Sequence, residues 1–280
     1  MIENKFQEFV EIVKILRKEC PWDREQTNDS IKAATIEEAY EVVEAIDNKD
    51  YAELKKELGD LLLHVVFHTT IAEESNHFKL ENVIDSIQEK LIRRHPHVFG
   101  NTEVNGADEV KKNWETIKLK EGRKSVVDGV PVSLPALQRA HRLQEKVSKV
   151  GFDWENKQDV WKKVIEEIEE MHEIENLKSL PAGKAGQNSQ PEADQHLAEN
   201  LKNEELNKKL ESEIGDVFFA LVNYSRFLGI NPENALRRTN EKFIKRFNYV
   251  EKKILESGRS LNESNLKEMD VYWEESKKDF

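Results

Sequence analysis

Residues 35–63 read TIEEAYEVVEAIDNKDYAELKKELGDLLL, a segment that predicts a helical hairpin. Apolar residues recur at helical spacing before and after a polar turn at Asn48. Gly and Pro are scarce in the whole chain, with 11 and 7 among 280 residues, so long stretches carry no helix breaker. The sequence therefore predicts an all-α protein.

Four carboxylates project from this hairpin. Glu38 and Glu41 are one helical turn apart, as are Glu57 and Asp60, so each pair lies on one face of its helix. A short turn makes the two helices antiparallel and brings these faces together. Four like charges in a partly desolvated site repel strongly unless a cation lies among them. Mg²⁺, with Mn²⁺ as a substitute, prefers such oxygen ligands, so the hairpin predicts a metal site.

The same pattern occurs a second time further along the chain. The segment VIEEIEE at 164–170 matches TIEEAYE at 35–41 in its acidic positions, and LESEIGD at 210–216 matches LKKELGD at 54–60. A single acidic pair at this spacing is typical of a solvated helix face, but its repetition beside apolar residues favours a metal site. The second set of predicted metal ligands is Glu167, Glu170, Glu213 and Asp216.

The duplication predicts two modules and a linker. We expect the first module over residues 1–122 and the second over 136–280, because the segment 123–135 between them contains Gly and Pro. A polar stretch at 179–197 separates the two acidic helices of the second copy, and we expect it to be an inserted mobile loop.

Three residues beside the acidic pairs are predicted to have structural roles. Gly59 and Gly215 precede the Asp in each copy, inside a predicted helix, where close approach of a neighbouring helix would explain them. His64 follows the first Asp by one turn, but its counterpart in the second copy is Ala220. We therefore expect His64 to be a core histidine or a neighbour of the ligands.

Composition restricts the partners and the compartment. A net charge of −12 disfavours nucleic acid, and no apolar run reaches the roughly 20 residues of a membrane-spanning helix. Cys20 is the single cysteine, and the N-terminal residues lack the apolar core of a signal peptide, so we expect a cytoplasmic protein. A phosphate substrate would need divalent cations and well-placed basic side chains to offset the acidic field.

Basic residues recur after both acidic segments and could bind phosphate oxygens. An ordinary exposed basic face is the alternative for each of them. Trp22 and Trp154 precede the acidic helices, and either could stack on a base or pack in a core. The basic residues are Lys242, Arg246 and Lys277, with Lys90, Arg94 and Lys118 at the matching positions of the first copy.

These motifs resemble those of the MazG family of nucleoside triphosphate pyrophosphohydrolases, whose mark is E-E-x-x-E followed by E-x-x-D on the next helix. The chain carries this mark twice, and the resemblance extends to CPWD at 20–23 and RRHPHVFG at 93–100. It implies tandem MazG-like helical-bundle modules, active sites between antiparallel helices, and a homodimer.

The resemblance also implies a reaction and residue roles. The reaction is Mg²⁺-dependent hydrolysis of a nucleoside triphosphate to the monophosphate and pyrophosphate, which would clear noncanonical or surplus nucleotides. Glu166, and Glu37 in the first copy, would be the catalytic residues that orient or activate water. The implied substrate-binding residues are Lys163, Lys242, Arg246, Trp273 and Lys277 in the second copy and Lys90, Arg94, Trp114 and Lys118 in the first.

Two other classes of protein are compatible with parts of this pattern. A carboxylate-bridged di-iron bundle needs Glu-x-x-His pairs, which neither acidic helix supplies. A non-enzymatic helical adaptor or regulatory partner would use its acidic faces only for solubility. The adaptor predicts that Glu167→Gln and Asp216→Asn leave every activity unchanged, whereas the enzyme predicts loss of turnover in a folded protein.

Overall fold

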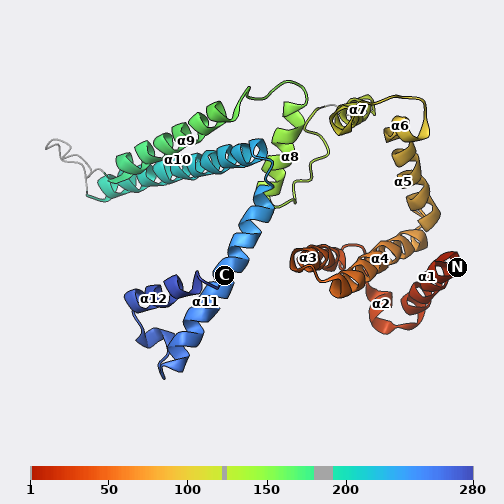
Figure 1. Ribbon diagram of the computed structural model, residues 1–280, viewed down its shortest axis with the longest axis horizontal. Coiled ribbons are helices and arrows are strands. Elements are labelled where there is room, and N and C mark those ends of the chain that lie inside the picture. The colour runs from red at the N-terminus through yellow and green to blue at the C-terminus, as the bar shows by residue number, and fades with distance from the viewer. Residues whose placement is uncertain (1, 122–124, 180–191, 280) are drawn as a thin grey trace. The chain divides into compact units, whose positions relative to one another are not determined.

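The computed structural model describes residues 2–121, 125–179 and 192–279, which form two compact units, Met1–Ile117 and Lys118–Phe280. Across these described ranges every regular element is a helix and no strand occurs, which confirms the all-α class (Figure 1). None of the helices described has the length and apolar character needed to cross a membrane.

The first unit is arranged around its longest helix, α4, which contacts α1, α3 and α5. Its core gathers apolar side chains from α1, the α2–α3 connection and α4, with Val13 and Val66 almost completely buried. Burial of such side chains is the main stabilising contribution to a small helical unit. The elements are α1 (Ile2–Glu19), α2 (Pro21–Glu25), α3 (Lys32–Asn48), α4 (Tyr51–Glu74), α5 (Leu80–Arg94), α6 (Pro96–Phe99) and α7 (Ala107–Lys120), the last of which contains the boundary between the units.

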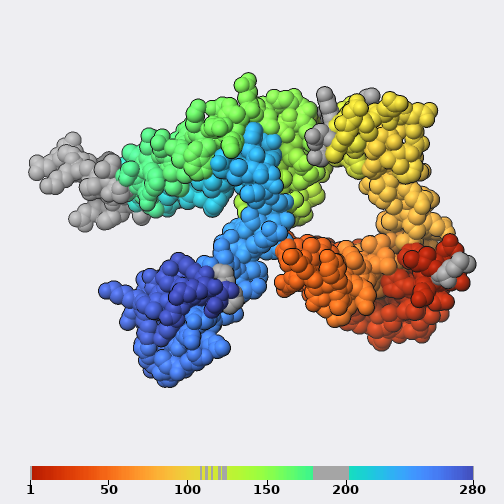
Figure 2. Space-filling model, viewed as in Figure 1, coloured from red at the N-terminus to blue at the C-terminus, as the bar shows by residue number. Residues whose placement is uncertain are grey.

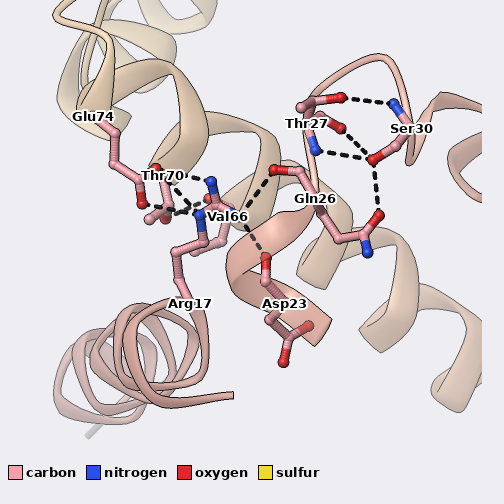
Figure 3. A network of polar contacts seen from close by, with 8 residues as sticks. All are labelled: Arg17, Asp23, Gln26, Thr27, Ser30, Val66, Thr70 and Glu74. Atoms are coloured by element: carbon pink, nitrogen blue, oxygen red, sulfur yellow. Dashed lines mark hydrogen bonds and ion pairs between the residues drawn. The ribbon is translucent and has the colours of Figure 1, made fainter. Parts of the chain in front are cut away.

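Arg17 ties three segments of this unit together. Its guanidinium makes a two-pronged ion pair with Glu74 on α4, with Nε to Oε1 and Nη2 to Oε2 both at 2.9 Å. Its third nitrogen, Nη1, donates to the backbone carbonyl oxygens of Asp23 and Gln26, so α1 also holds the connection that leads into α3 (Figure 3). Charge-assisted bonds of this kind are stronger than neutral ones.

The second unit contains a long antiparallel hairpin of α9 and α10, which lie side by side (Figure 1). α8 packs on α10, and α12 packs on the C-terminal half of α11 (Figure 2). Val164 from α9 and Val222 from α10 are almost completely buried, as are Val250 and Ile254 from α11. The elements are α8 (Ala136–Ser148), α9 (Lys157–Ser179), α10 (Glu192–Phe227), α11 (Pro232–Glu256), the 3₁₀ helix η1 (Leu261–Glu263) and α12 (Leu266–Ser276).

The predicted linker is described from residue 125 onward, and the predicted insertion only at its two ends. Residues 125–135 contain no helix but are held on α8, where buried Lys146 donates from Nζ to the carbonyl oxygens of Val126 and Asp128, both at 3.0 Å. Within the predicted insertion, residues 180–191 lie outside the described ranges. α10 already begins at Glu192, because the segment that follows is rich in good helix formers.

Candidate active sites

The hairpin predicted at residues 35–63 is formed by α3 and α4. Lys49 takes the left-handed conformation at φ 56° directly after α3, and Asp50 caps α4 by accepting bonds from the backbone N–H groups of Ala52 and Glu53, both at 3.0 Å. The turn is therefore only two residues long, and the two helices run antiparallel with their acidic residues facing each other.

Three carboxylates meet in the first hairpin. Oxygens of Glu38, Glu41 and Glu57 all lie within 4.8 Å of one another, with Glu57 buried and Glu41 exposed. Asp60, the fourth predicted ligand, is outside this group but close enough to Glu38 to raise the pKa of that carboxyl. The hairpin thus brings together three of the four predicted ligands, with the fourth one turn further along α4.

The proximity of these carboxylates changes their protonation. Burial, followed by contacts with Glu53 and Glu41, raises the pKa of Glu57 to about 7. Burial also raises the pKa of Glu38, with further contributions from Glu41 and Asp60. A raised carboxyl pKa is the expected response of clustered acids in the absence of a cation, so the cluster favours a bound positive charge.

A polar chain leads from the first cluster into the helix interface. Thr35 Oγ1 lies 2.9 Å from His64 Nδ1 and 2.8 Å from His68 Nε2, and His68 Nδ1 lies 2.8 Å from Asn28 Oδ1. His64 Nε2, at the other end, lies 3.9 Å from Glu38 Oε1. Burial lowers the pKa of His68, which keeps that ring neutral near pH 7. His64 therefore neighbours a predicted ligand, as expected, but Thr35, His68 and Asn28 were not singled out by the sequence.

The second hairpin, formed by α9 and α10, repeats the arrangement. Oxygens of Glu167, Glu213 and Asp216 lie within 4.8 Å of one another, with Glu167 buried. Glu170, the fourth predicted ligand, is outside this group, and burial together with Glu167 raises its pKa. Each copy therefore assembles a group of three carboxylates. The predicted ligand left out is Asp60 in the first copy and Glu170 in the second.

Lys163 distinguishes the second cluster from the first. Its Nζ lies 2.6 Å from Glu166 Oε1 and 2.8 Å from Glu167 Oε1, and these two bonds raise the pKa of the ammonium. The matching position of the first copy is Ala34. The predicted catalytic residue Glu166 is exposed, and it shares the Lys163 ammonium with the predicted metal ligand Glu167. Its counterpart in the first copy, Glu37 on α3, is also exposed.

A cavity of about 790 Å³ adjoins the second cluster. Lys163, Glu167 and Asp216 form its polar wall, and the remainder is mostly apolar. Trp154 lines this cavity while Trp22 in the first unit is exposed on α2, so neither of these indoles is a core residue. The apolar and aromatic lining comprises Val127, Leu143, Val147, Phe152, Trp154, Phe219 and Ala220.

An ion pair fixes one side of this cavity. Arg226 on α10 makes a two-pronged pair with Asp153 from the loop that precedes α9, with Nη1 to Oδ2 at 3.0 Å, and it also bonds Asn223. Since Trp154 follows Asp153, the pair holds the aromatic wall in place. The sequence did not predict this contact, because Arg226 lies 73 residues from Asp153.

The predicted phosphate-binding residues of the second copy gather at α11 and α12. The guanidinium carbon of Arg246 lies 5.9 Å from the centre of the Trp273 ring, and Lys277 pairs with Glu274. Lys242 lies on the same helix as Arg246. Within the described residues of one chain, Lys163 is the predicted substrate-binding residue that lines the cavity, and these four do not.

The first copy repeats this basic and aromatic contact. Arg94 lies over the Trp114 ring at 6.0 Å, and His95 packs edge-on against the same indole, with ring centres 4.7 Å apart. Lys90 lies on α5 with Arg94, and Lys118 lies on α7 with Trp114. The duplication seen in the sequence is therefore also a duplication of this cation–π geometry.

The close-approach explanation for the two helical glycines is wrong for the described chain. A Cβ atom placed on Gly59 or Gly215 would meet nothing within 4 Å. These faces of α4 and α10 are therefore open beside each acidic cluster.

The fold and these clusters define the class of protein: an all-helical protein with two similar modules, each of which contains a helical hairpin with a carboxylate cluster. Comparison with known proteins gives the family. The model for the MazG nucleotide pyrophosphohydrolase domain matches residues 26–99 and 155–251, and these two regions contain both hairpins. The chain belongs to the MazG family.

Two relatives that match over nearly their full length agree with this assignment, and a third matches over about half of its length. A nucleoside triphosphate pyrophosphohydrolase/pyrophosphatase MazG of Thermotoga maritima is 41% identical over 277 residues, which span 97% of this chain and 95% of that protein. A nucleoside triphosphate pyrophosphohydrolase of Escherichia coli K12 is 38% identical over 282 residues, 98% of each chain. An uncharacterized Bacillus subtilis protein, YabN, is 41% identical over 282 residues, 99% of this chain and 52% of that protein.

Proposed function

We propose that this protein hydrolyses nucleoside triphosphates to the monophosphate and pyrophosphate, with Mg²⁺ as its metal and Mn²⁺ as a possible substitute. The observation that carries the proposal is the convergence, in each hairpin, of three carboxylates within 4.8 Å. The names of the two full-length relatives, both nucleoside triphosphate pyrophosphohydrolases, support the same activity.

The donor set fits a hard divalent cation. Opposite oxygen ligands of one Mg²⁺ are about 4.2 Å apart, so oxygens within 4.8 Å need only small side-chain rotations to share an ion. Burial, together with repulsion between neighbouring carboxylates, raises the pKa of Glu57 and Glu38 in the first cluster and of Glu170 beside the second, and a bound cation would offset both effects. Carboxylates alone, with no thiolate among them, suit Mg²⁺ or Mn²⁺.

The residues of the second site can divide the reaction between them. Bound Mg²⁺ would offset phosphate charge and acidify a water. Glu166, exposed beside the cluster, would orient the attacking water and accept its proton as the water oxygen bonds to the α phosphorus. The bond from the α phosphorus to the bridging oxygen breaks, and pyrophosphate leaves. Lys163 would turn from Glu166 and Glu167 toward the phosphate oxygens.

The cavity beside the second cluster would receive the nucleoside. Its walls are mainly apolar and aromatic, and a flat base can stack on an indole such as Trp154. Lys163, Glu167 and Asp216 line the part of the cavity that adjoins the acidic cluster, so a nucleotide with its base on the apolar wall would place its phosphates at the metal site.

We further propose a homodimer. Large apolar side chains on α4 and α10 are exposed beside the acidic clusters, which is unusual for an isolated chain. A second chain packed there would cover them and could bring its α11 and α12 toward the cavity, with Arg246 and Trp273. Phe218→Glu, at a residue that is 56% exposed, should shift the mass measured by light scattering from dimer to monomer, and a wild-type monomer would contradict the dimer.

The proposed role is removal of noncanonical or surplus nucleotides in the cytoplasm. A largely apolar base pocket discriminates weakly between similar bases and would accept several triphosphates. The single cysteine is compatible with a reducing compartment.

The decisive experiment is to incubate the purified protein and Mg²⁺ with a panel of standard and noncanonical nucleoside triphosphates, and to measure monophosphate and pyrophosphate separately. We expect equal amounts of both products. Orthophosphate with diphosphate, or no turnover of any triphosphate, would overturn the proposal. An unchanged rate in a folded Glu167→Gln, Asp216→Asn double variant would favour the adaptor.

A further inference from the structure

The two acidic clusters have different neighbours. In the second, the cation beside Glu167 is Lys163 from the same helix. In the first, the residue beside Glu38, the counterpart of Glu167, is His64 from the facing helix. Lys163 is replaced there by Ala34, and His64 is replaced in the second copy by Ala220. The duplicated sites therefore offer a metal different chemistry.

The hydrogen bonds that link His64, Thr35, His68 and Asn28 determine which nitrogen of each histidine ring carries the proton. Asn28 Oδ1 is an acceptor, so His68 Nδ1, at 2.8 Å, carries the single proton of that neutral ring. The lone pair of His68 Nε2, 2.8 Å from Thr35 Oγ1, then requires the Thr35 hydroxyl proton, because two lone pairs at that distance would repel. The backbone carbonyl oxygen of Ile31, at 3.1 Å from the same Oγ1, is the longer and competing acceptor. With its proton used in this way, Thr35 Oγ1 accepts from His64 Nδ1 at 2.9 Å. In the neutral His64 ring the free lone pair is consequently on Nε2.

The position of this lone pair suits a metal ligand. Nε2 lies 3.9 Å from Glu38 Oε1, which is too long for a hydrogen bond. Two ligands at about 2.1 Å from one ion can be separated by up to about 4.2 Å, so both atoms can bind the same ion. A lone pair beside a carboxylate is otherwise repulsive. Glu57, Asp60 and His64 also lie along one face of α4, at spacings of three and four residues.

The hydrogen bonds of Thr35, His68 and Asn28 are of the kind expected around a metal-binding histidine. Such residues usually donate their second ring N–H to an oxygen that fixes the tautomer and ring orientation. Thr35 supplies that oxygen here, and His68 and Asn28 hold the Thr35 hydroxyl in turn. In the second copy Val164 and Tyr224 replace Thr35 and His68, so the whole chain of contacts is missing together with its histidine.

The geometry points to His64 Nε2 as a nitrogen ligand of the first metal site, which makes that site a mixed carboxylate and imidazole centre selective for Mn²⁺, Co²⁺ or a similar transition metal over Mg²⁺. The second site remains an all-oxygen Mg²⁺ site. This inference rests on the proposed function, since it requires that Glu38 and Glu57 bind a cation. Imidazole favours transition metals, while Mg²⁺ favours oxygen.

The direct test is nitrogen coordination in the full chain. Mn²⁺ is added to wild-type protein and to the Glu167→Gln, Asp216→Asn variant, which directs the ion to the first site, and pulsed electron paramagnetic resonance is recorded. We expect ¹⁴N modulation typical of a bound imidazole, its replacement by a ¹⁵N signal after labelling with ¹⁵N-histidine, and its loss in His64→Gln. His172→Gln, at an exposed histidine of the second unit, is the control.

Affinities supply a second measurement. His64→Gln and Thr35→Val should each weaken Co²⁺ binding at the first site about tenfold or more, and change Mg²⁺ binding less than about threefold. Bound Mn²⁺ without ¹⁴N coupling, or equal losses for Co²⁺ and Mg²⁺, would show that His64 only forms an ion pair with Glu38 and would overturn the inference while leaving the proposed function intact. No metal binding at the first hairpin alone would overturn the inference, and no metal binding at both hairpins would overturn the proposed function as well.

Discussion

Lys163 Nζ lies 2.8 Å from Glu167 Oε1 and 2.6 Å from Glu166 Oε1, so one ammonium joins a predicted metal ligand to the predicted catalytic base. Lys163→Met removes a cation that we expect to contact phosphate in the transition state, and kcat/KM should fall about 100-fold. Mg²⁺ affinity should stay the same or rise, because a competing cation is lost.

Lys162→Met is the matched control for this prediction. Lys162 is the preceding residue, is more exposed, and pairs with Asp159 on the same helix. Its replacement should change kcat/KM less than twofold. Equal effects of the two substitutions on steady-state kinetics would mean that the net charge of α9, and not the position of Lys163, matters.

Glu57 should make the metal-free protein less stable as pH rises. Its pKa is about 7 in the folded protein and near 4.5 when unfolded, so between these values the folded state binds the extra proton. The contribution of Glu57 to the free energy of unfolding therefore falls as pH rises from about 4.5 to 7. Below and above this range the contribution is constant. Thermal unfolding of Glu57→Gln should lack this component, and Mg²⁺ should restore more stability at pH 8 than at pH 5.

A comparison of wild type with Glu57→Gln at each pH cancels the contribution of other titrating groups. If the difference in melting temperature between the two proteins is the same at pH 5 and pH 8, the carboxyl does not hold a proton in the folded state and the prediction is wrong.

The second cluster should carry most of the turnover. It adjoins the cavity and has Lys163, whereas the first has Ala34 at that position. Paired substitution of Glu167→Gln with Asp216→Asn should therefore lower kcat by more than about 100-fold. The equivalent pair in the first hairpin, Glu38→Gln with Asp60→Asn, should lower it less than about tenfold. The reverse ranking, measured on proteins with normal helical circular dichroism, would place the main site in the first unit.

The Arg226–Asp153 pair should act on substrate binding and not on chemistry. Arg226→Gln releases the loop that carries Trp154, so KM for a nucleoside triphosphate should rise about tenfold with kcat nearly unchanged. Asp153→Asn should behave alike, and the double variant should be no worse than either single one because both remove the same contact. Additive losses in this cycle would show that the two residues act separately.

Arg17 should be important for stability and not for catalysis. Arg17→Met leaves Glu74 without its partner and removes donors from the carbonyls of Asp23 and Gln26, so the free energy of unfolding should fall by about 2–3 kcal/mol. Urea unfolding measures this change. Lys18→Met, at an exposed neighbour, should stay within about 0.5 kcal/mol of wild type. Similar values for both variants would mean that solvent replaces the Arg17 contacts.

Local pattern was sufficient to predict the helices and the repeat. The spacing of apolar residues before and after Asn48, with few Gly and Pro, leaves an antiparallel hairpin as the only compact arrangement of residues 35–63. Acidic residues three apart on each helix can then face each other. The existence of an acidic cluster in each hairpin could therefore be expected from the sequence, because it depends only on helical period and a short turn.

Long-range contacts could not be predicted in this way. The helical period alone does not exclude Asp60 from the first cluster or Glu170 from the second, since membership depends on the rotation of one helix against its partner. The placement of Arg246 and Trp273 away from the cavity depends on where α11 leads the chain after α10.

The amino-acid sequence by itself determined that this protein is helical, duplicated and twice acidic, because helix formation and one-turn spacing are local properties. Tertiary structure alone decided that Thr35 joins His64 to His68, and that Asp153 meets Arg226 across the second unit. Such contacts join residues far apart in sequence, and their geometry exists only once packing has set the separation and rotation of the helices.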